Sequence, residues 1–263
     1  METTEAALQT PAAIASAGRL RFCTDIGYPP MEFRKGAEIV GADIEIASDV
    51  ARRLGVDVEF ADEPVEGIID ALYAGRGDLI INAFTDNETR RQRLTFVDYI
   101  SVSQTVVVPR DNPLGIHSVE DLAGRQVLVQ ADTSNEESLR QLDAANQANG
   151  LPPMRIAAFK GTTGKTTARA AETLRCGEAD ADFLDVINAG WNAKHHPEVA
   201  VADFVVNHHP YGIGLRKDDL ELQQAVLAAI KAMYADGTAQ RILGSWDLPH
   251  VALAGPDEVR LSD

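Results

Sequence analysis

The segment from Thr85 to Arg90 holds the side chains best suited to binding an anion. It follows the apolar run 78–84, DLIINAF, which predicts a buried strand. If Asn87 caps a helix that starts at the next residue, Arg90 lies in the first turn, where backbone N–H groups converge with its guanidinium. Such a group holds a carboxylate in a bidentate manner. A structural ion pair of Arg90 is the alternative interpretation.

A second segment of this kind follows the predicted strand 125–130, where Ala131-Asp132-Thr133-Ser134 brings hydroxyl groups to the start of a helix. Thr133 and Ser134 suit an anion site. Plain helix capping explains them as well, because every helix start needs caps whether or not a ligand is near. Both interpretations stay open at this point.

Other motifs predict no catalytic residue, no metal ligand and no cofactor site. KGTTGKT at 160–166 resembles a phosphate loop, but Phe159 stands where the loop needs its first glycine. The adjacent pairs at 195–196 and 208–209 indicate solvated loop histidines rather than metal ligands, because sequence neighbours project apart.

Three aspartates near position 182 form a possible carboxylate cluster. On a strand, Asp180 and Asp182 share one face and Asp185 points to the other. A proton-sharing catalytic pair of Asp180 and Asp182 is one interpretation. A single carboxylate at the strand end is the simpler one.

The composition excludes several classes of partner. The chain has 24 Lys and Arg against 40 Asp and Glu, a net charge of −16, which repels both nucleic acid and anionic lipid. Hydrophobic residues make up 45%, which is enough for a globular core. The two cysteines, Cys23 and Cys176, cannot build a disulfide framework, and we expect both as free thiols.

Strands and helices alternate along the chain and indicate an α/β fold. The predicted strands are 19–25, 56–60, 78–84, 104–109, 125–130, 154–159, 181–187 and 212–217. The predicted helices are 43–55, one through IIDALYAGRGD, a short one through SVEDLAG, 134–150, 167–177 and 219–237. We expect two α/β lobes, each a mostly parallel sheet flanked by helices.

The lobes are expected to exchange chain segments. We predict a flexible leader at 1–18, a first lobe from 19–106 that is rejoined by 208–253, a second lobe at 107–207 and a tail at 254–263. Residues 1–17 lack the basic and apolar regions of a signal peptide.

Short motifs recur in a fixed order along most of the chain, and none of them is specific alone. They are Thr24-Asp25, Tyr28-Pro29-Pro30-Met31-Glu32-Phe33, Gly41 to Ala47, Gly77 to Ile81, Phe84 to Arg90, Phe96 to Tyr99, Leu122 to Arg125, Gln130 to Ser134, Leu174 to Ala181, Asp185, Tyr211 to Asp218 and Asp236 to Thr238. In this order and spacing, the chain from Leu20 to about Trp246 resembles the family 3 extracellular solute-binding proteins, the polar amino-acid receptors of ABC importers.

The resemblance implies a two-lobe, type II periplasmic-binding-protein-like fold with the ligand cleft at the hinge, whose closure signals to a permease. It implies that Arg90 grips the ligand α-carboxylate with Thr85 and with Thr133 or Ser134, and that Asp185 receives the α-ammonium. The expected ligand-binding set is Asp25, Tyr28, Met31, Val65, Ala83, Thr85, Arg90, Thr133, Ser134 and Asp185.

The side-chain pocket is the part of the site in which this chain departs from the family pattern. Asp25 and Tyr28 match positions that line the pocket, and a buried Asp25 favours a basic ligand side chain. A turn-capping carboxylate is the equal alternative for Asp25. Val65 replaces a usual aromatic residue and Met31 a usual Phe. Asp132 replaces a usual Gly, and its charge is unfavourable near a ligand carboxylate unless it turns outward.

The resemblance further implies a monomer that binds an amino acid, works with an ABC transporter permease and has no enzymatic activity. It implies a periplasmic or extracellular location, with tethering as a lipoprotein as one form of it, and a signal segment absent from this sequence. An enzyme similar to cyclohexadienyl dehydratase is the alternative, with Asp182 or Glu172 as the acid. A binding protein for an opine, a betaine or ectoine is another.

Overall fold

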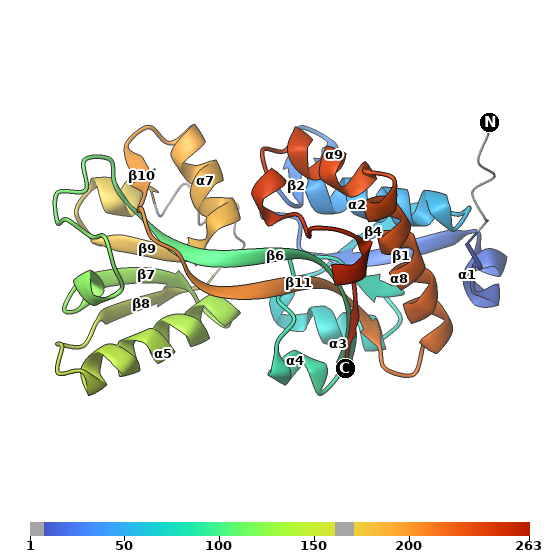
Figure 1. The fold of residues 1–263 in the computed structure, drawn as a ribbon, viewed down its shortest axis with the longest axis horizontal. Coiled ribbons are helices and arrows are strands. Elements are labelled where there is room, and N and C mark those ends of the chain that lie inside the picture. Colours follow the sequence, from blue (N-terminus) through green and yellow to red (C-terminus); the bar gives the residue numbers. More distant parts are fainter. Residues whose placement is uncertain (1–7, 161–170) are drawn as a thin grey trace. The chain divides into compact units, whose positions relative to one another are not determined.

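The computed structural model describes residues 8–160 and 171–263 and divides the chain into two compact units (Figure 1). Unit 1 takes in the chain up to Ile26, Met31–Ser101 and Pro210–Asp263. Unit 2 takes in Gly27–Pro30 and Val102–His209. The sequence predicts the crossings near 106 and 207 instead, because the strands that pass from one unit to the other mix polar and apolar residues and show no clear boundary.

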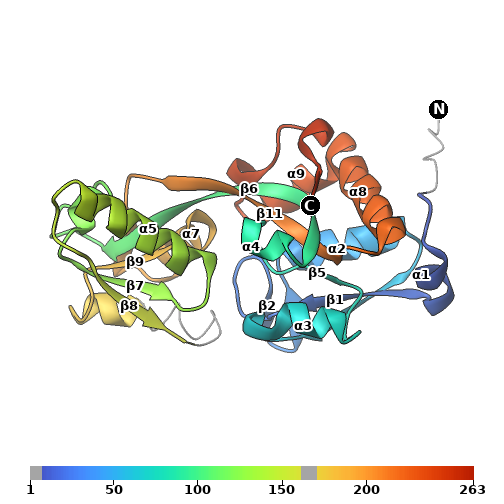
Figure 2. The same ribbon diagram turned by 90° about the horizontal axis from the view of Figure 1, so that it is seen from below.

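Two long strands belong to both units: β6 (Leu94–Pro109) and β11 (Val206–Arg216). They are neighbours in the sheet and run side by side in Figure 1 and in Figure 2. The sequence predicts only 104–109 of the first and 212–217 of the second. The stretch 207–212, expected as a polar connection, is strand, so His208 and His209 are not loop residues. Their predicted loop position is wrong, because the exposed positions of a strand carry polar side chains just as a loop does.

Unit 1 is a mixed sheet with helices around it. Its other strands are β1 (Arg19–Thr24), β2 (Phe33–Lys35), β3 (Glu38–Val40), β4 (Asp57–Asp62), β5 (Leu79–Ile80) and β12 (Leu261–Ser262). Its helices are α1 (Ala12–Ala17), α2 (Ala42–Arg53), α3 (Ile68–Tyr73), α4 (Glu88–Arg91), α8 (Leu220–Ala235) and α9 (Thr238–Ser245), with short 3₁₀ turns at Val65–Gly67, Pro249–Val251 and Pro256–Glu258.

The strand order in unit 1 is β4-β1-β5-β11-β6, with β12 added to β6. Strand β1 pairs in parallel with β4 and β5, and β11 runs antiparallel to β5. Helices α2 and α9 lie on one side of β1 and helices α3 and α4 on the other (Figure 1). This is the α/β arrangement that the alternation of strands and helices predicts.

Both ends of unit 1 carry more structure than the sequence predicts. Helix α1 lies inside the expected flexible leader, where it buries Ile14 and ends at Gly18 with φ 67°. Strand β12 lies inside the expected tail, where Leu261 and Ser262 pair with Val97 and Phe96. Each element is short, so its periodicity is too brief to read, and tertiary contact stabilises it.

Unit 2 has the strand order β6-β9-β7-β8, with β10 added to β6. Its own strands are β7 (Gln126–Gln130), β8 (Arg155–Phe159), β9 (Ala181–Asp185) and β10 (Val199–Val201). Its described helices are α5 (Ser134–Ala148) and α7 (Val186–His195), with a 3₁₀ turn at Glu120–Leu122 where the sequence predicts a short helix. Most of the phosphate-loop-like segment and the first part of the helix predicted at 167–177 lie outside the described residues.

Helices α5 and α7 cover opposite faces of the unit 2 sheet. Leu139 of α5 belongs to the same buried cluster as Val127 and Val129 of β7, whereas Ala189 of α7 belongs to the cluster that contains Leu128. Successive strand residues point to opposite faces. The interior of unit 2 is therefore layered helix, sheet, helix, as expected for a parallel sheet.

Candidate functional site

Arg90 lies at the end of a strand-to-helix segment in unit 1. Asn87 is the N-cap of α4, and its side chain accepts a hydrogen bond of 2.9 Å from the Arg90 N–H, as predicted. Arg90 Nη1 donates to the Thr85 carbonyl oxygen at 2.8 Å, and the guanidinium carbon lies 3.7 Å from the centroid of the Phe84 ring. One bond and one stacking contact thus fix the plane of this guanidinium.

The neighbouring Arg91 makes the structural ion pair. Its Nε and Nη2 donate to the two carboxylate oxygens of Asp86 at 2.7 and 3.0 Å, and the Asp86 side chain is completely buried. Hydrogen bonding to Asp86 raises the pKa of Arg91. The buried Asp86 carboxylate is therefore paired with Arg91.

Asp25 and Val65 lie together in unit 1. Asp25 Oδ2 accepts the Val65 N–H at 3.0 Å, and the Asp25 N–H donates to Asn82 Oδ1. Burial raises the pKa of Asp25, and the bond from Val65 opposes that rise. Asp25 therefore caps a backbone N–H, but that N–H belongs to Val65, 40 residues away, and not to the turn in which Asp25 lies.

Met31 and Ala83 complete the predicted residues of unit 1. Met31 is completely buried, and its carbonyl oxygen accepts the Asp43 N–H at 2.9 Å. Ala83 has φ 42°, and its N–H donates to Asp43 Oδ2 at 2.6 Å. The strand predicted at 78–84 stops at Ile80, but the Phe84 carbonyl oxygen still accepts the Gly212 N–H at 2.9 Å.

Asp185 is the centre of a polar cluster in unit 2. It follows the last apolar residue of β9 and is 3% exposed. Its Oδ2 accepts hydrogen bonds from Tyr28 Oη at 2.8 Å and from Asn135 Nδ2 at 3.2 Å. Its Oδ1 lies 3.6 Å from His209 Nε2. Two residues of the predicted set, Tyr28 and Asp185, are therefore in direct contact.

A chain of side-chain amides leads to Asp185. Asn207 Nδ2 donates to Gln104 Oε1 at 3.0 Å, Gln104 Nε2 donates to Asn135 Oδ1, and Asn135 donates to Asp185. Gln104 is completely buried, and each bond dictates which end of the next amide points onward. The sequence gives no signal for this chain, because the three amides come from β11, β6 and α5.

Thr133 and Ser134 begin helix α5. The Thr133 hydroxyl accepts the Glu136 N–H at 3.3 Å and donates to the Gln130 carbonyl oxygen at 2.7 Å. Thr133 is therefore the N-cap, and Ser134 is the first helical residue. Asp132 has φ 62° and a half-exposed side chain 3.3 Å from Lys160 Nζ, so its charge turns outward and is paired.

Asp180 and Asp182 do not share a proton. Asp180 Oδ2 accepts the Gln126 N–H at 2.7 Å, so this side chain holds the edge of β7. Burial alone raises the pKa of Asp182 to about 7. The proton-sharing interpretation is wrong. The other acid considered, Glu172, is 70% exposed and lies 3.8 Å from Arg175.

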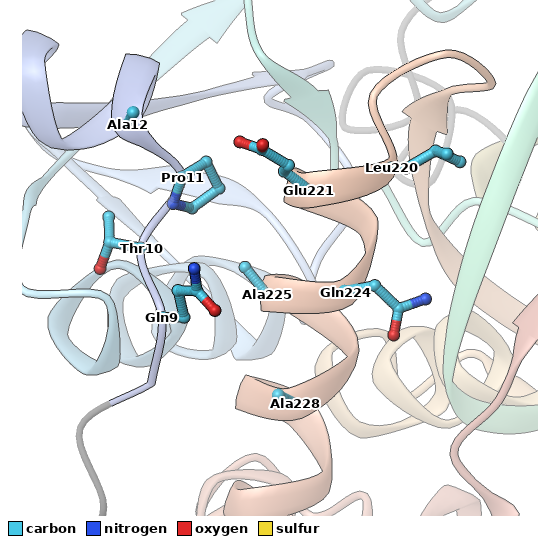
Figure 3. Close-up of a pocket in the computed structure, with 9 residues that line it drawn as sticks. All are labelled: Gln9, Thr10, Pro11, Ala12, Leu220, Glu221, Gln224, Ala225 and Ala228. Carbon is cyan, nitrogen blue, oxygen red and sulfur yellow. The ribbon is translucent and has the colours of Figure 1, made fainter.

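A cavity of about 540 Å³ opens on unit 1 beside helix α8 (Figure 3). Its lining residues are Gln9, Thr10, Pro11, Ala12, Leu220, Glu221, Gln224, Ala225 and Ala228. None of the predicted ligand-binding residues lines it. The described part of the chain has no cluster of three His, Cys, Asp or Glu side chains suited to a metal ion.

The chain matches known proteins over most of its length. Residues 20–249 match the model of the bacterial extracellular solute-binding proteins, family 3. The arginine-binding protein ArgT of Corynebacterium glutamicum is 27% identical over 90% of this chain and 77% of its own length. The histidine-binding periplasmic protein of Escherichia coli K12 is 27% identical over 89% of each chain.

A solved structure agrees in fold. The ancestral amino-acid-binding protein AncCDT-1, described as a precursor of cyclohexadienyl dehydratase, is 32% identical, with a TM-score of 0.77 over 89% of this chain and 97% of that one. The predicted type II periplasmic-binding-protein-like fold is confirmed. Among residues 8–160 and 171–263, no helix combines the length and the apolar content needed to cross a lipid bilayer.

Proposed function

Because this chain belongs to family 3 of the bacterial extracellular solute-binding proteins, we propose that it binds an amino acid outside the cytoplasm for delivery to an ABC importer. Family 3 proteins bind solutes and work with ABC transporters. The proposal rests on the residues that each unit offers to one end of a zwitterion. A zwitterion taken from water needs both of its charges paired.

The ligand carboxylate binds at Arg90, and the geometry of this guanidinium is the observation that carries the proposal. Stacking on Phe84 and the bond to the Thr85 carbonyl hold the guanidinium plane before any ligand arrives. A planar donor group held in one orientation loses little entropy when it forms two parallel hydrogen bonds to a carboxylate. Thr85, with Thr133 or Ser134, adds hydroxyl groups at the same end of the ligand.

The ligand ammonium binds at Asp185. Hydrogen bonds from Tyr28 and Asn135 to Oδ2 fix the orientation of this buried side chain. The ammonium binds at this carboxylate close to His209, whose Nε2 lies 3.6 Å from Asp185 Oδ1. An opine, a betaine or ectoine differs from an amino acid at this nitrogen, so Asp185 discriminates between these classes by the N–H donors they offer.

The ligand side chain is basic, and arginine is the first candidate. Asp25 is half buried, and burial raises its pKa. A nearby cation stabilises the ionised form of a carboxyl group in such a site. The names of the relatives ArgT and the histidine-binding protein point to the same side-chain class. Tyr28, Met31, Val65 and Ala83 line the rest of the pocket.

Calorimetric titration with a panel of amino acids tests the proposal. We expect tight binding of one class, with arginine among it. Arg90→Ala is expected to lower the affinity by about 100-fold or more, because removing one partner of a buried charge pair costs about 2–5 kcal/mol. Arg93→Ala is the matched control, because Arg93 is an exposed arginine paired with Asp70 on the surface. Unchanged affinity in Arg90→Ala contradicts the site, and no binding of any amino acid contradicts the function.

A dehydratase-like enzyme is the second candidate function, and the buried Asp182 favours it. A carboxyl group with a pKa near 7 suits a general acid. Incubation with prephenate or arogenate decides between the two: an aromatic product that is lost in Asp182→Asn supports the enzyme. No product together with amino-acid binding supports the receptor.

The location and the assembly state follow the same proposal. The protein acts as a monomer in the periplasm or outside the cell, and a lipoprotein tether is one form of that location. Light scattering on the purified protein with and without arginine gives the mass: a dimer contradicts the monomer.

A further inference from the structure

Two carboxyl groups, those of Glu32 and Asp43, are buried side by side in unit 1. Both side chains are completely buried. Their backbones are pressed together, because the Asp43 N–H donates to the Met31 carbonyl oxygen at 2.9 Å. A Cβ on Gly41 would lie 2.0 Å from the same oxygen, and φ at Gly41 is 137°. Only glycine allows this approach.

The hydrogen bonds divide the two carboxyl groups into an acceptor and a group that needs a proton. Asp43 Oδ2 accepts the Ala83 N–H and Oδ1 accepts the Tyr99 hydroxyl, each at 2.6 Å. Neither oxygen of Glu32 receives a hydrogen bond from any donor group in the described part of the chain. Its side-chain partner is Asp43. Two carboxylates cannot hydrogen-bond to each other, whereas a protonated Glu32 can donate to Asp43.

The surrounding charges oppose a second ionisation. Asp43 and Asp25 are the charged groups that act on Glu32, and both are acidic. The Tyr99 hydroxyl of β6 donates to Asp43, and burial raises the pKa of this phenol, which carries no charge at neutral pH. Tyr234 of α8 donates to the Tyr99 carbonyl oxygen. Burial raises the pKa of Glu32 well above its ordinary value and that of Asp43 to about 6. Like charges in one dry site are not both ionised.

The pair acts on the proposed carboxylate site through one backbone bond. Ala83 has φ 42°, a conformation that a non-glycine residue adopts only when its surroundings hold it there. The hydrogen bond from the Ala83 N–H to Asp43 stabilises this backbone conformation. The next residues are Phe84, on which the Arg90 guanidinium stacks, and Thr85, to whose carbonyl Arg90 donates.

We propose that Glu32 and Asp43 share one proton and that this neutral-plus-ionised pair is a positioning group, which holds Ala83 and thereby orients Phe84, Thr85 and Arg90. The part that concerns ligand affinity rests on the proposed function. The shared proton and the hold on Ala83 do not rest on it. Loss of the proton leaves two repelling carboxylates, and the bond to Ala83 weakens.

The test compares the wild-type protein with Glu32→Gln over pH 5 to 9. The introduced amide stays neutral and can donate an N–H to Asp43, so it replaces the proton with one that does not titrate. Glu38→Gln is the matched control, because it makes the same change at an exposed side chain of strand β3. Three quantities are measured: the unfolding constant in urea, the protection of the Ala83 amide from hydrogen exchange, and the affinity for arginine.

The proposal fixes the direction of each result. A folded-state pKa above the unfolded value gives stability that is complete at low pH and is lost as the pH rises toward the folded pKa. The wild-type unfolding constant therefore increases by up to about tenfold per pH unit for the one shared proton. In Glu32→Gln this slope decreases and the Ala83 protection becomes independent of pH. Glu38→Gln follows the wild type.

The outcomes separate this inference from the proposed function. An unchanged pH slope in Glu32→Gln overturns the shared proton. A changed slope with unchanged Ala83 protection overturns the positioning role. If no variant binds arginine, the proposed ligand is wrong, and the urea and exchange data still decide the pair. If Glu32→Gln does not fold, the same two pH profiles of the wild type decide it: flat profiles overturn the proposal.

Discussion

Two adjacent arginines, Arg90 and Arg91, have different partners and therefore different expected roles. Arg91 holds both oxygens of the buried Asp86, whereas Arg90 stacks on Phe84 and donates to a backbone carbonyl. Breaking a buried ion pair from one side leaves an unpaired charge in the interior. The contacts of Arg90 with the Phe84 ring and the Thr85 carbonyl oxygen involve no buried carboxylate.

Arg91→Ala is therefore expected to lower the free energy of unfolding by about 3 kcal/mol, the cost of leaving one buried partner unpaired. Arg90→Ala is expected to change it by less than about 1 kcal/mol and to act on ligand affinity instead. Urea unfolding of both variants measures the difference. In the double variant Arg91→Ala with Asp86→Ala, part of the loss is expected to return. Equal destabilisation by the two single substitutions contradicts this division of roles.

Asp25 connects a capping role with a specificity role. Its carboxylate accepts the Val65 N–H, and an asparagine at this position keeps an oxygen for that bond while removing the charge. We expect Asp25→Asn to lower the affinity for arginine by about tenfold relative to that for glutamine, since a hydrogen bond to a charged group is worth about 1.5–3 kcal/mol.

The measurement is the ratio of the two dissociation constants by calorimetry. Glu66→Gln is the control, because Glu66 acts on Asp25 through its charge but is exposed. If the ratio is the same in Asp25→Asn and in the wild type, Asp25 only caps the backbone and the ligand side chain is recognised elsewhere.

At the level of elements, the amide chain Asn207–Gln104–Asn135 joins β11, β6 and α5 to Asp185. Asn135→Ala removes a donor to Asp185 Oδ2, so we expect a loss of about tenfold or more in amino-acid affinity. A hydrogen bond to a charged group contributes about 1.5–3 kcal/mol. A ligand that lacks the α-ammonium is expected to lose much less. Gln147→Ala on the exposed side of α5 is the control, because it removes an amide bonded to Asp143. An equal loss for both ligands contradicts a role through Asp185.

The same elements explain what the sequence predicts and what it does not. The cap at Asn87 and the start of α5 at Ser134 are predicted correctly, because cap chemistry is local. The length of β6 is missed, because residues before Gln104 read as a mixture of polar and apolar positions and are buried only by strand pairing. The amide chain is invisible in one sequence, because it depends on which distant side chains share a sheet face.

At the level of the whole molecule, this strongly acidic chain contains buried carboxyl groups whose pKa is raised. Burial, followed by the charge of Asp86, raises the pKa of Asp98 in unit 1 to about 7, and Arg260 opposes that rise. Burial alone raises the pKa of Asp182 in unit 2 to about 7. The pKa of other carboxyl groups is lowered: hydrogen bonds lower the pKa of Glu136, chiefly the one from Arg140.

These shifts set the pH range in which the fold is most stable. A raised folded-state pKa gives stability that is complete below about 4 and is lost as the pH rises through 7, whereas a lowered one gives stability that is lost in acid. The midpoint of thermal unfolding is therefore expected to be higher at pH 6 than at pH 8 and to fall again below pH 4. Asp182→Asn removes the contribution of Asp182 and Asp98→Asn that of Asp98, so each variant is expected to reduce the change between pH 6 and 8. Glu178→Gln is the control, because this side chain is exposed and lies close to Asp182 in sequence. A midpoint that rises from pH 6 to 8 in the wild type contradicts the protonated state of both buried groups, and scanning calorimetry over this range measures it directly.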